Sequence, residues 1–122
     1  MAKHHETLPA GQGIEENLKK AVSEMLILQL FSEKERYIGT ISKELNERSN
    51  GALTIVFPYA AVYRLQDRGY LKESEKRIAD DGRKRQYYAI TKDGLKFLQE
   101  LKKSYFSFTS GIASVLGDGT TK

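Results

Sequence analysis

Apolar residues recur at helical spacing near the start of the chain. Five of them follow one another at intervals of four and three residues: Ile14, Leu18, Ala21, Met25 and Leu28. This is the spacing of one face of an amphipathic helix, and it predicts a helix from residue 14 to about residue 30 or 31. The preceding residues 1–13 are polar and contain Pro9, Gly11 and Gly13, so we expect a flexible tail there.

A second, shorter apolar stripe follows a polar connection. Ile38, Ile41 and Leu45 stand at helical spacing, and the pair Asn50-Gly51 is typical of a helix stop. The pattern predicts a helix that begins at residue 37 or 39 and ends near residue 48.

The next apolar stretch, Leu53–Phe57, is short and β-branched, and it is compatible with a brief strand or a buried connection. Pro58 then suits the first position of a third helix, where its missing N–H costs nothing. We expect this helix to run from Pro58 to about Arg68 and to end at Gly69. Its inward-facing residues should be Ala61, Val62 and Leu65.

Beyond the third helix the period changes to that of strands. Tyr70–Arg77 and Gln86–Thr91 are candidate strands, and Asp80-Asp81-Gly82 between them is a turn signal. The segment therefore predicts a β-hairpin with a charged tip. Since alternate residues of a strand face opposite sides, one of Tyr87 and Tyr88 should be in the core and the other half-exposed.

The last third of the chain predicts one long helix, with Thr91 or Asp93 as N-cap and an end by Gly117. Six apolar residues in it step by three and four and form a heptad seam: Leu98, Leu101, Tyr105, Phe108, Ile112 and Val115. Such a seam either packs on its own domain or joins two copies of the chain. We expect dimerisation, because the first helix also has surplus apolar surface. Residues 118–122 form a polar tail.

Three helices followed by a hairpin is the order of a winged helix-turn-helix, an α+β fold that is mostly helical. In that fold the third helix lies in the major groove of double-stranded DNA. We expect residues 14–92 to form the DNA-binding domain and residues 93–117 the dimerisation helix.

The composition excludes several other classes of protein. The 122 residues suffice for one domain, and the absence of Cys rules out disulfide scaffolds, thiolate metal sites and cysteine catalysis. His4 and His5 lie in the polar tail without further ligands, so no metal site or cofactor is expected. No nucleophile elbow or glycine-rich phosphate loop is present, and we therefore expect no enzymatic activity.

The charge balance permits an anionic partner without requiring one, since Lys and Arg total 20 and Asp and Glu total 16, a net charge of +4. No apolar run approaches the roughly 20 residues of a membrane span, and the first residues lack the apolar core of a signal peptide. These features lead us to expect a cytoplasmic protein.

Candidate DNA contacts lie on the third helix and the hairpin. Tyr59 and Tyr63 share a face near the start of the helix, with Arg64 beside them. Clustered cations of the hairpin suit sequence-independent phosphate binding: Lys76, Arg77, Arg83, Lys84 and Arg85. Structural alternatives are that Arg64 pairs with an acidic neighbour such as Asp67, that one tyrosine belongs to the core, and that the wing is a solvated turn.

Two stretches, YAAVYRLQDRGYL (Tyr59–Leu71) and DGRKRQYYAITKDGLKFL (Asp81–Leu98), carry an ordered combination of residues that resembles the PadR family of winged-helix transcriptional regulators. The matching positions are Tyr59, Arg64, Leu65, Gly69, Asp81, Gly82, Arg85, Tyr87, Tyr88, Ile90, Thr91 and Gly94. The resemblance covers about residues 18–101. Ala60 departs from a frequent proline, and Arg83-Lys84 replaces small residues or prolines and makes the wing more basic.

The resemblance implies a homodimeric repressor of the short form, joined through its single C-terminal helix. It also implies possible relief by a small hydrophobic or aromatic effector, to which some relatives respond. The chain has no Trp, so an effector site built on tryptophan is excluded. Tyr105, Phe106 and Phe108 either line an effector cavity or pack in a core.

The main alternative function is a winged-helix protein-interaction module that does not bind DNA. The modest net charge favours it, as do the acidic residues Glu73, Glu75, Asp80 and Asp81 near the wing. A third reading is a small-molecule carrier or sensor in which a hydrophobic pocket matters more than the DNA contacts.

Overall fold

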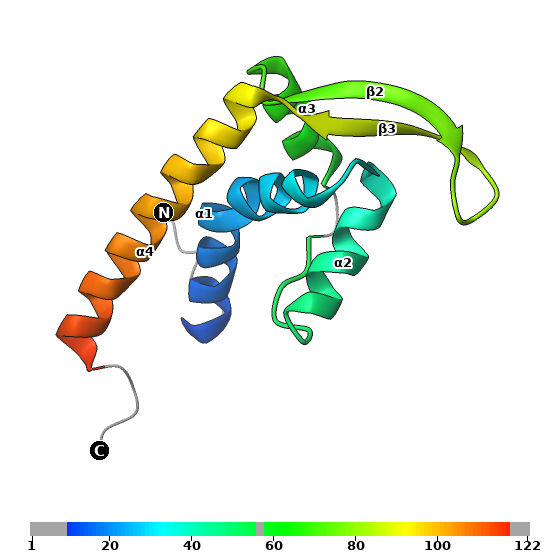
Figure 1. The fold of residues 1–122 in the computed structure, drawn as a ribbon. Coiled ribbons are helices and arrows are strands. Elements are labelled where there is room, and N and C mark those ends of the chain that lie inside the picture. The colour runs from blue at the N-terminus through cyan, green and yellow to red at the C-terminus, as the bar shows by residue number, and fades with distance from the viewer. Residues whose placement is uncertain (1–9, 56–57, 118–122) are drawn as a thin grey trace, which may run out of the picture.

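The computed structural model of the chain describes residues 10–55 and 58–117. Over these residues the elements follow the order of a winged helix-turn-helix with a fourth helix, which confirms the predicted fold class (Figure 1). The elements are α1 (Ala10–Glu33), β1 (Arg36–Tyr37), the 3-10 helix η2 (Ile38–Thr40), α2 (Ile41–Arg48), α3 (Tyr59–Asp67), β2 (Leu71–Ile78), β3 (Lys84–Ile90) and α4 (Lys92–Leu116).

The first helix begins at Ala10, earlier than the residue 14 expected from the sequence. Gly11 and Gly13 suggested a tail, but a glycine inside a helix costs only about 1 kcal/mol relative to alanine. The last turns of α1 are anchored in the core and offset that cost. The rest of the predicted N-terminal tail, with His4 and His5, lies outside the described residues, as do residues 118–122.

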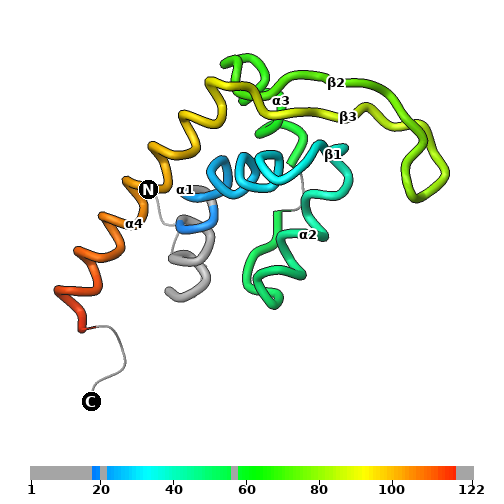
Figure 2. Tube along the Cα trace, in the orientation of Figure 1, coloured from blue at the N-terminus to red at the C-terminus, as the bar shows by residue number. Residues whose placement is uncertain are grey.

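A two-residue strand replaces the start of the predicted second helix. Arg36 and Tyr37 form β1, which pairs antiparallel with Tyr88 and Tyr87 of β3 (Figure 2). The sheet therefore has three strands in the order β1-β3-β2, with one more strand than the predicted hairpin. Two residues carry no detectable periodicity, which is why the apolar pattern did not predict this strand.

The connection from α2 to α3 has no regular structure over residues 53–55, and residues 56–57 lie outside the described part of the chain. Pro58 takes the N-cap position of α3, so the helix itself begins at Tyr59. Ala61, Val62 and Leu65 are buried, which confirms the predicted inward face.

One hydrophobic core joins α1, the helix-turn-helix and the sheet. Its buried residues are Ile27, Leu28, Leu30, Phe31, Ile38, Ile41, Leu45, Ala61, Val62, Leu65, Leu71, Tyr88 and Leu98. Tyr88 is buried and Tyr87 half-buried, as the strand alternation predicted. Leu98 is 1% exposed, so this first residue of the heptad seam packs within its own protomer.

The start of α4 is fixed closely to the turn between α3 and β2. The Thr91 hydroxyl accepts a hydrogen bond from the Gly94 N–H at 3.0 Å and donates one to the Gly69 carbonyl at 2.6 Å, which confirms Thr91 as N-cap. Gly94 permits this approach, because a Cβ there would lie 2.2 Å from the Tyr70 carbonyl oxygen. Phe97 also stacks on Tyr70, with ring centroids 4.3 Å apart.

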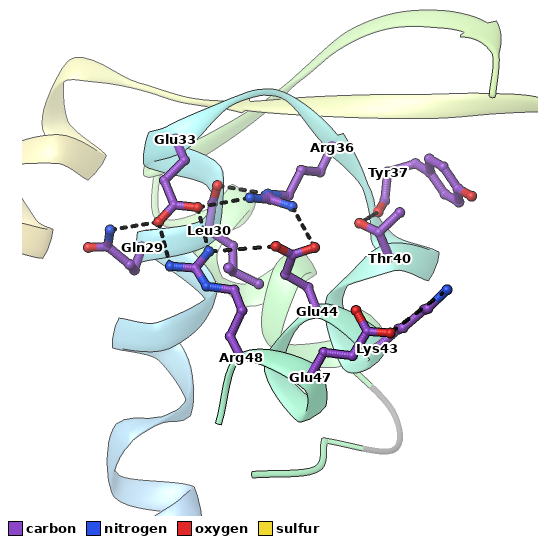
Figure 3. A network of polar contacts seen from close by, with 10 residues as sticks. All are labelled: Gln29, Leu30, Glu33, Arg36, Tyr37, Thr40, Lys43, Glu44, Glu47 and Arg48. Carbon is purple, nitrogen blue, oxygen red and sulfur yellow. Dashed lines mark hydrogen bonds and ion pairs between the residues drawn. The ribbon is translucent and has the colours of Figure 1, made fainter. Parts of the chain in front are cut away.

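A polar network holds α2 against the end of α1 (Figure 3). Arg36 is buried, and it donates to the Leu30 carbonyl at 2.8 Å and to Glu33 at 2.9 Å. Arg48 of α2 donates twice to Glu33, at 2.6 and 2.9 Å. Glu44 lies 3.4 Å from Arg36 and 3.6 Å from Arg48. The hydrogen bond from Arg48, followed by one from Gln29, lowers the pKa of Glu33 to about 2.

Two parts of the molecule extend from this body in different directions. The β2–β3 hairpin projects on one side, and the C-terminal half of α4 runs out on the other (Figure 1). The candidate DNA contacts and most of the exposed apolar seam therefore occupy separate regions.

Candidate nucleic-acid interface

Helix α3 presents two tyrosines to solvent. Tyr59 and Tyr63 are each 48% exposed, and their spacing of four residues places them on one face. That face is opposite to the buried residues of the helix, so the structure excludes a core position for either tyrosine. α3 is thus covered on one side and open on the other.

The tyrosine face of α3 adjoins strands β1 and β3. Tyr59 and Tyr63 line a shallow hollow of about 160 Å³ together with Tyr37 of β1 and Arg85 and Gln86 of β3. Three elements therefore bring aromatic and polar side chains to one surface. The structure unites Tyr59, Tyr63 and Arg85 from the sequence prediction and adds Tyr37 and Gln86.

Arg64 lies on the flank of α3 that faces α1. Its Nε is 3.2 Å from the Glu24 carboxylate, and Arg68 reaches the other oxygen of Glu24 at 3.2 Å. Arg64 therefore does pair with an acidic side chain, as the structural alternative held, but the partner is Glu24, forty residues earlier in the chain, and not Asp67. Sequence spacing within α3 carries no signal for this pair.

Arg77 makes several contacts close to the turn end of strand β2. Its guanidinium forms an ion pair with Glu35, lies 3.3 Å from Glu75 and stands over the Tyr87 ring at 4.1 Å. The register of β2 against β3 shifts between Glu73 and Lys76. Such a bulge bends a strand and strengthens its twist. This one ends at Lys76, the residue before Arg77.

Three of the predicted DNA-binding cations of the hairpin have no ion-pair partner among residues 10–55 and 58–117. Lys76, Arg83 and Lys84 are exposed and take part in none of the ion pairs of that region. All three are among the DNA contacts predicted from the sequence, and their charges are available to bind an external anion.

Arg85 has an acidic partner in the turn. Its Nη2 and Nε lie 2.5 and 3.2 Å from one Asp81 oxygen, and the Arg83 N–H donates to the other oxygen at 3.0 Å. The hydrogen bond from Arg85, followed by that from the Arg83 N–H, lowers the pKa of Asp81. Asp81 thus shapes the turn and neutralises Arg85 at the same time.

The sequence does not reveal the site residues whose position depends on β1. The apolar pattern predicts that Tyr37 begins a helix, and nothing in the sequence indicates that it pairs with Tyr87 and reaches the hollow. The sequence predicts a strand position for Gln86 and no contact with DNA. Once β1 is known, both follow from the register of the sheet.

A second surface is apolar and lies on α1 and α4. Residues of the two helices and of the α2–α3 connection line an open groove of about 760 Å³, among them Leu18, Val22, Leu26, Tyr105 and Phe106. Beyond the groove α4 exposes further large apolar side chains: Phe108, Ile112, Val115 and Leu116. Of the predicted seam, Leu98 is buried and Leu101 partly buried against the core, so the exposed part begins at Tyr105.

In residues 10–55 and 58–117, no group of three or more His, Asp or Glu side chains is placed to hold a metal ion. No helix in the same residues has the length and apolar character needed to cross a membrane.

Comparison with known proteins places this arrangement in a family. Residues 27–100 match the transcriptional regulator PadR-like family. The uncharacterized protein X of Lysinibacillus sphaericus is 37% identical over 82 residues, which are 66% of this chain and 74% of that protein.

Solved structures agree with the match. A PadR-like transcriptional regulator from Bacillus cereus has a TM-score of 0.71 and 28% identity over 83% of this chain and 97% of that chain. A PadR family transcriptional regulator from Eggerthella lenta has a TM-score of 0.75 and 21% identity over 95% and 98% of the two chains, which shows a shared fold. Since the matched residues run from the core half of α1 through α3 and the hairpin into α4, the chain belongs to the PadR-like family of transcriptional regulators.

Proposed function

We propose that the protein is a homodimeric, sequence-specific DNA-binding repressor. The observation that carries the proposal is that the exposed tyrosines of α3 and Arg85 of the wing line one hollow. When a duplex lies against this surface, α3 enters its major groove and the wing contacts its phosphate backbone. Residues 14–92 serve as the DNA-binding domain and residues 93–117 as the dimerisation helix.

Each candidate residue has a distinct task in this proposal. Tyr59 and Tyr63 contact base edges or phosphates from the open face of α3. Arg64 contacts phosphate at the flank of the helix, where it remains half-exposed beside Glu24. The wing cations bind backbone phosphates without regard to sequence; they are Lys76, Arg77, Arg83, Lys84 and Arg85.

The test is fluorescence anisotropy with a duplex from the chain's own promoter region, titrated with salt. We expect binding that weakens by about 1,000-fold between about 50 and 200 mM salt, as several phosphate contacts require. Absence of binding to any duplex at low salt contradicts the proposal. Changing Arg83, Lys84 and Arg85 together to Glu should abolish binding.

The same charge reversal separates this function from a protein-interaction module without DNA binding. The ion pairs of Arg77 with Glu35 and of Arg85 with Asp81 favour that alternative, because they reduce the positive charge of the wing. A protein partner's affinity should survive the triple substitution largely intact, whereas DNA affinity should not.

Dimerisation is supported by the fit between the groove and the exposed end of α4. The groove is lined mainly by apolar side chains of α1 and α4. The apolar residues of α4 that extend beyond it are exposed, and no side chain in the described part of the protomer covers them. A second copy, related by a two-fold axis, buries both surfaces at once. It also presents two α3 helices to successive turns of DNA. The seam for this contact is Leu101, Tyr105, Phe108, Ile112 and Val115, with Leu98 supporting it from the core.

We further propose that a small hydrophobic or aromatic effector relieves repression by entering the groove. Its volume lies in the range of small-molecule sites, and Tyr105 and Phe106 line it. The protein acts in the cytoplasm, without enzymatic activity and without a cofactor or metal. A hydrophobic compound that binds should raise the thermal stability in the absence of DNA and weaken DNA binding.

A further inference from the structure

Three tyrosine hydroxyls line the hollow between β1, α3 and β3 without a hydrogen-bond partner in the described part of the chain. The hydroxyls of Tyr37, Tyr59 and Tyr63 make no hydrogen bond to any of the residues that the structure describes, and all three residues line the hollow. The Gln86 side-chain amide donates to the neighbouring Tyr87 carbonyl at 3.0 Å. The hollow is thus surrounded by groups that suit an oxyanion.

Arg85 stands between this hollow and Asp81. Its Nη2 and Nε both donate hydrogen bonds to a single oxygen of Asp81, while Nη1 has no hydrogen-bond partner among the described residues. Its guanidinium carbon lies 5.1 Å from the centre of the Tyr37 ring, at the wall of the hollow. The hydrogen bond that Arg85 donates to Asp81 is the first cause of the raised pKa of Arg85, and the proximity of Tyr37 and Tyr59 contributes further.

We propose that this hollow is the binding site of one backbone phosphate of duplex DNA, held by Arg85 and the tyrosine hydroxyls. Asp81 is then the internal counter-ion of Arg85, and the phosphate displaces it. The inference rests on the proposed DNA-binding function. Guanidinium and hydroxyl groups are common phosphate ligands in protein–DNA complexes. A carboxylate that close to the same guanidinium repels a second anion, so the two compete.

The exchange is feasible because the Asp81–Arg85 pair is exposed. Exposed ion pairs are weak, and Asp81 swings into water once the phosphate has taken its place. The pair therefore neutralises Arg85 in the free protein. When DNA binds and the pair breaks, the full positive charge of Arg85 is available to the phosphate.

The test measures affinity for a short labelled duplex of mixed sequence at several salt concentrations. Asp81→Asn removes the charge but keeps an oxygen for the Arg83 N–H. We expect it to bind roughly three- to fivefold tighter than the unmodified protein. Asp80→Asn removes the same charge one residue away, at a side chain that forms no ion pair with any residue the structure describes, and it should have a smaller effect. Arg85→Gln should weaken binding and lower the salt slope by about one.

A double-mutant cycle provides the decisive comparison. In the Arg85→Gln background the gain from Asp81→Asn should disappear, because no guanidinium remains to be released. Tyr37→Phe should weaken binding roughly threefold, whereas Tyr70→Phe, away from the hollow, should not. The proposed phosphate site is contradicted if Asp81→Asn raises DNA affinity equally in both backgrounds, or if Tyr37→Phe leaves the affinity unchanged.

These outcomes are distinct from failure of the proposed function. If the unmodified protein binds no duplex at low salt, the regulator is not a DNA-binding protein of this kind. If it binds while the cycle is additive, DNA lies elsewhere on the wing. Thermal melting of every variant confirms that each is folded.

Discussion

The Glu24 carboxylate of α1 and the Arg64 guanidinium of α3 lie 3.2 Å apart. This ion pair joins the helix that lines the apolar groove to the helix that carries the exposed tyrosines. Arg68, the C-cap residue of α3, reaches the same carboxylate, so one acidic side chain ties the C-terminal end of α3 to α1. The contact adds a polar link to the apolar packing between α1 and α3.

The ion pair should make a small but measurable contribution to stability. Glu24→Gln and Arg64→Gln, combined in a double-mutant cycle and measured by urea unfolding, should give a coupling free energy of about 0.5 kcal/mol, as is usual for exposed pairs. Glu100→Gln on the exposed face of α4 is the control and should show no coupling with Arg64→Gln. Strict additivity of the first pair would mean that it forms no interaction in solution.

Gly94 should be intolerant of any side chain. A Cβ there meets the Tyr70 carbonyl oxygen at 2.2 Å and the Ile90 Cγ1 at 2.7 Å, so Gly94→Ala should lower the free energy of unfolding by about 2 kcal/mol. Gly111→Ala in the same helix has open space around it and should raise it by about 0.5–1 kcal/mol. Chemical denaturation of both variants tests the claim, which fails if they behave alike.

Acid should weaken the contact between α1 and α2 through Glu33. Hydrogen bonds from Arg48 and Gln29 depress the pKa of Glu33 from 4.5 to about 2 in the folded protein. Its contribution is therefore complete above the unfolded pKa and is lost as the pH falls from about 5 to about 2. The side chain is 31% exposed, and after screening the contribution is about 1 kcal/mol.

Glu33→Gln should accordingly be less stable than the unmodified protein by about 1 kcal/mol near neutral pH. It should also lose less stability over that acidic range. Glu47→Gln, which removes a carboxylate from an exposed pair with Lys43 at 4.0 Å, serves as the matched control and should retain the acid response. Parallel pH profiles for all three proteins would disprove the assignment to Glu33.

The exposed end of α4 should determine the oligomeric state. Phe108 is 71% exposed in the protomer, and a buried carboxylate at an apolar dimer interface is strongly unfavourable. Phe108→Glu should therefore yield a monomer in light scattering, while Ser110→Glu, on the opposite face of α4, should remain dimeric. A monomeric unmodified protein, or a dimeric Phe108→Glu variant, would exclude this interface.

Much of this fold is predictable from local patterns, because the relevant signals are close in sequence. The helical stripe of Ala61, Val62 and Leu65 and the Asp81-Gly82 turn of the wing each lie within a few residues, and the structure confirms them. Thr91 is a predictable N-cap for the same reason. The exposed tyrosine face follows directly from the inward one.

Features that depend on long-range pairing were not predictable. Strand β1 exists because Arg36 and Tyr37 meet β3, some fifty residues later, and the partner of Arg64 lies on α1. The heptad assigned Leu98 to an interface, although the core of its own protomer buries it. A regular apolar period identifies a buried side of a helix, but it does not say which surface covers it.

The claim that α3 and the wing form one DNA-binding face is tested most directly by hydrogen–deuterium exchange of the protein with and without a promoter duplex. When the duplex is bound, we expect slower amide exchange at the start of α3, in β1 and along the hairpin. The C-terminal half of α4 should exchange at the same rate as in the free protein. Protection confined to α4, or protection of the hairpin with α3 unchanged, would contradict it.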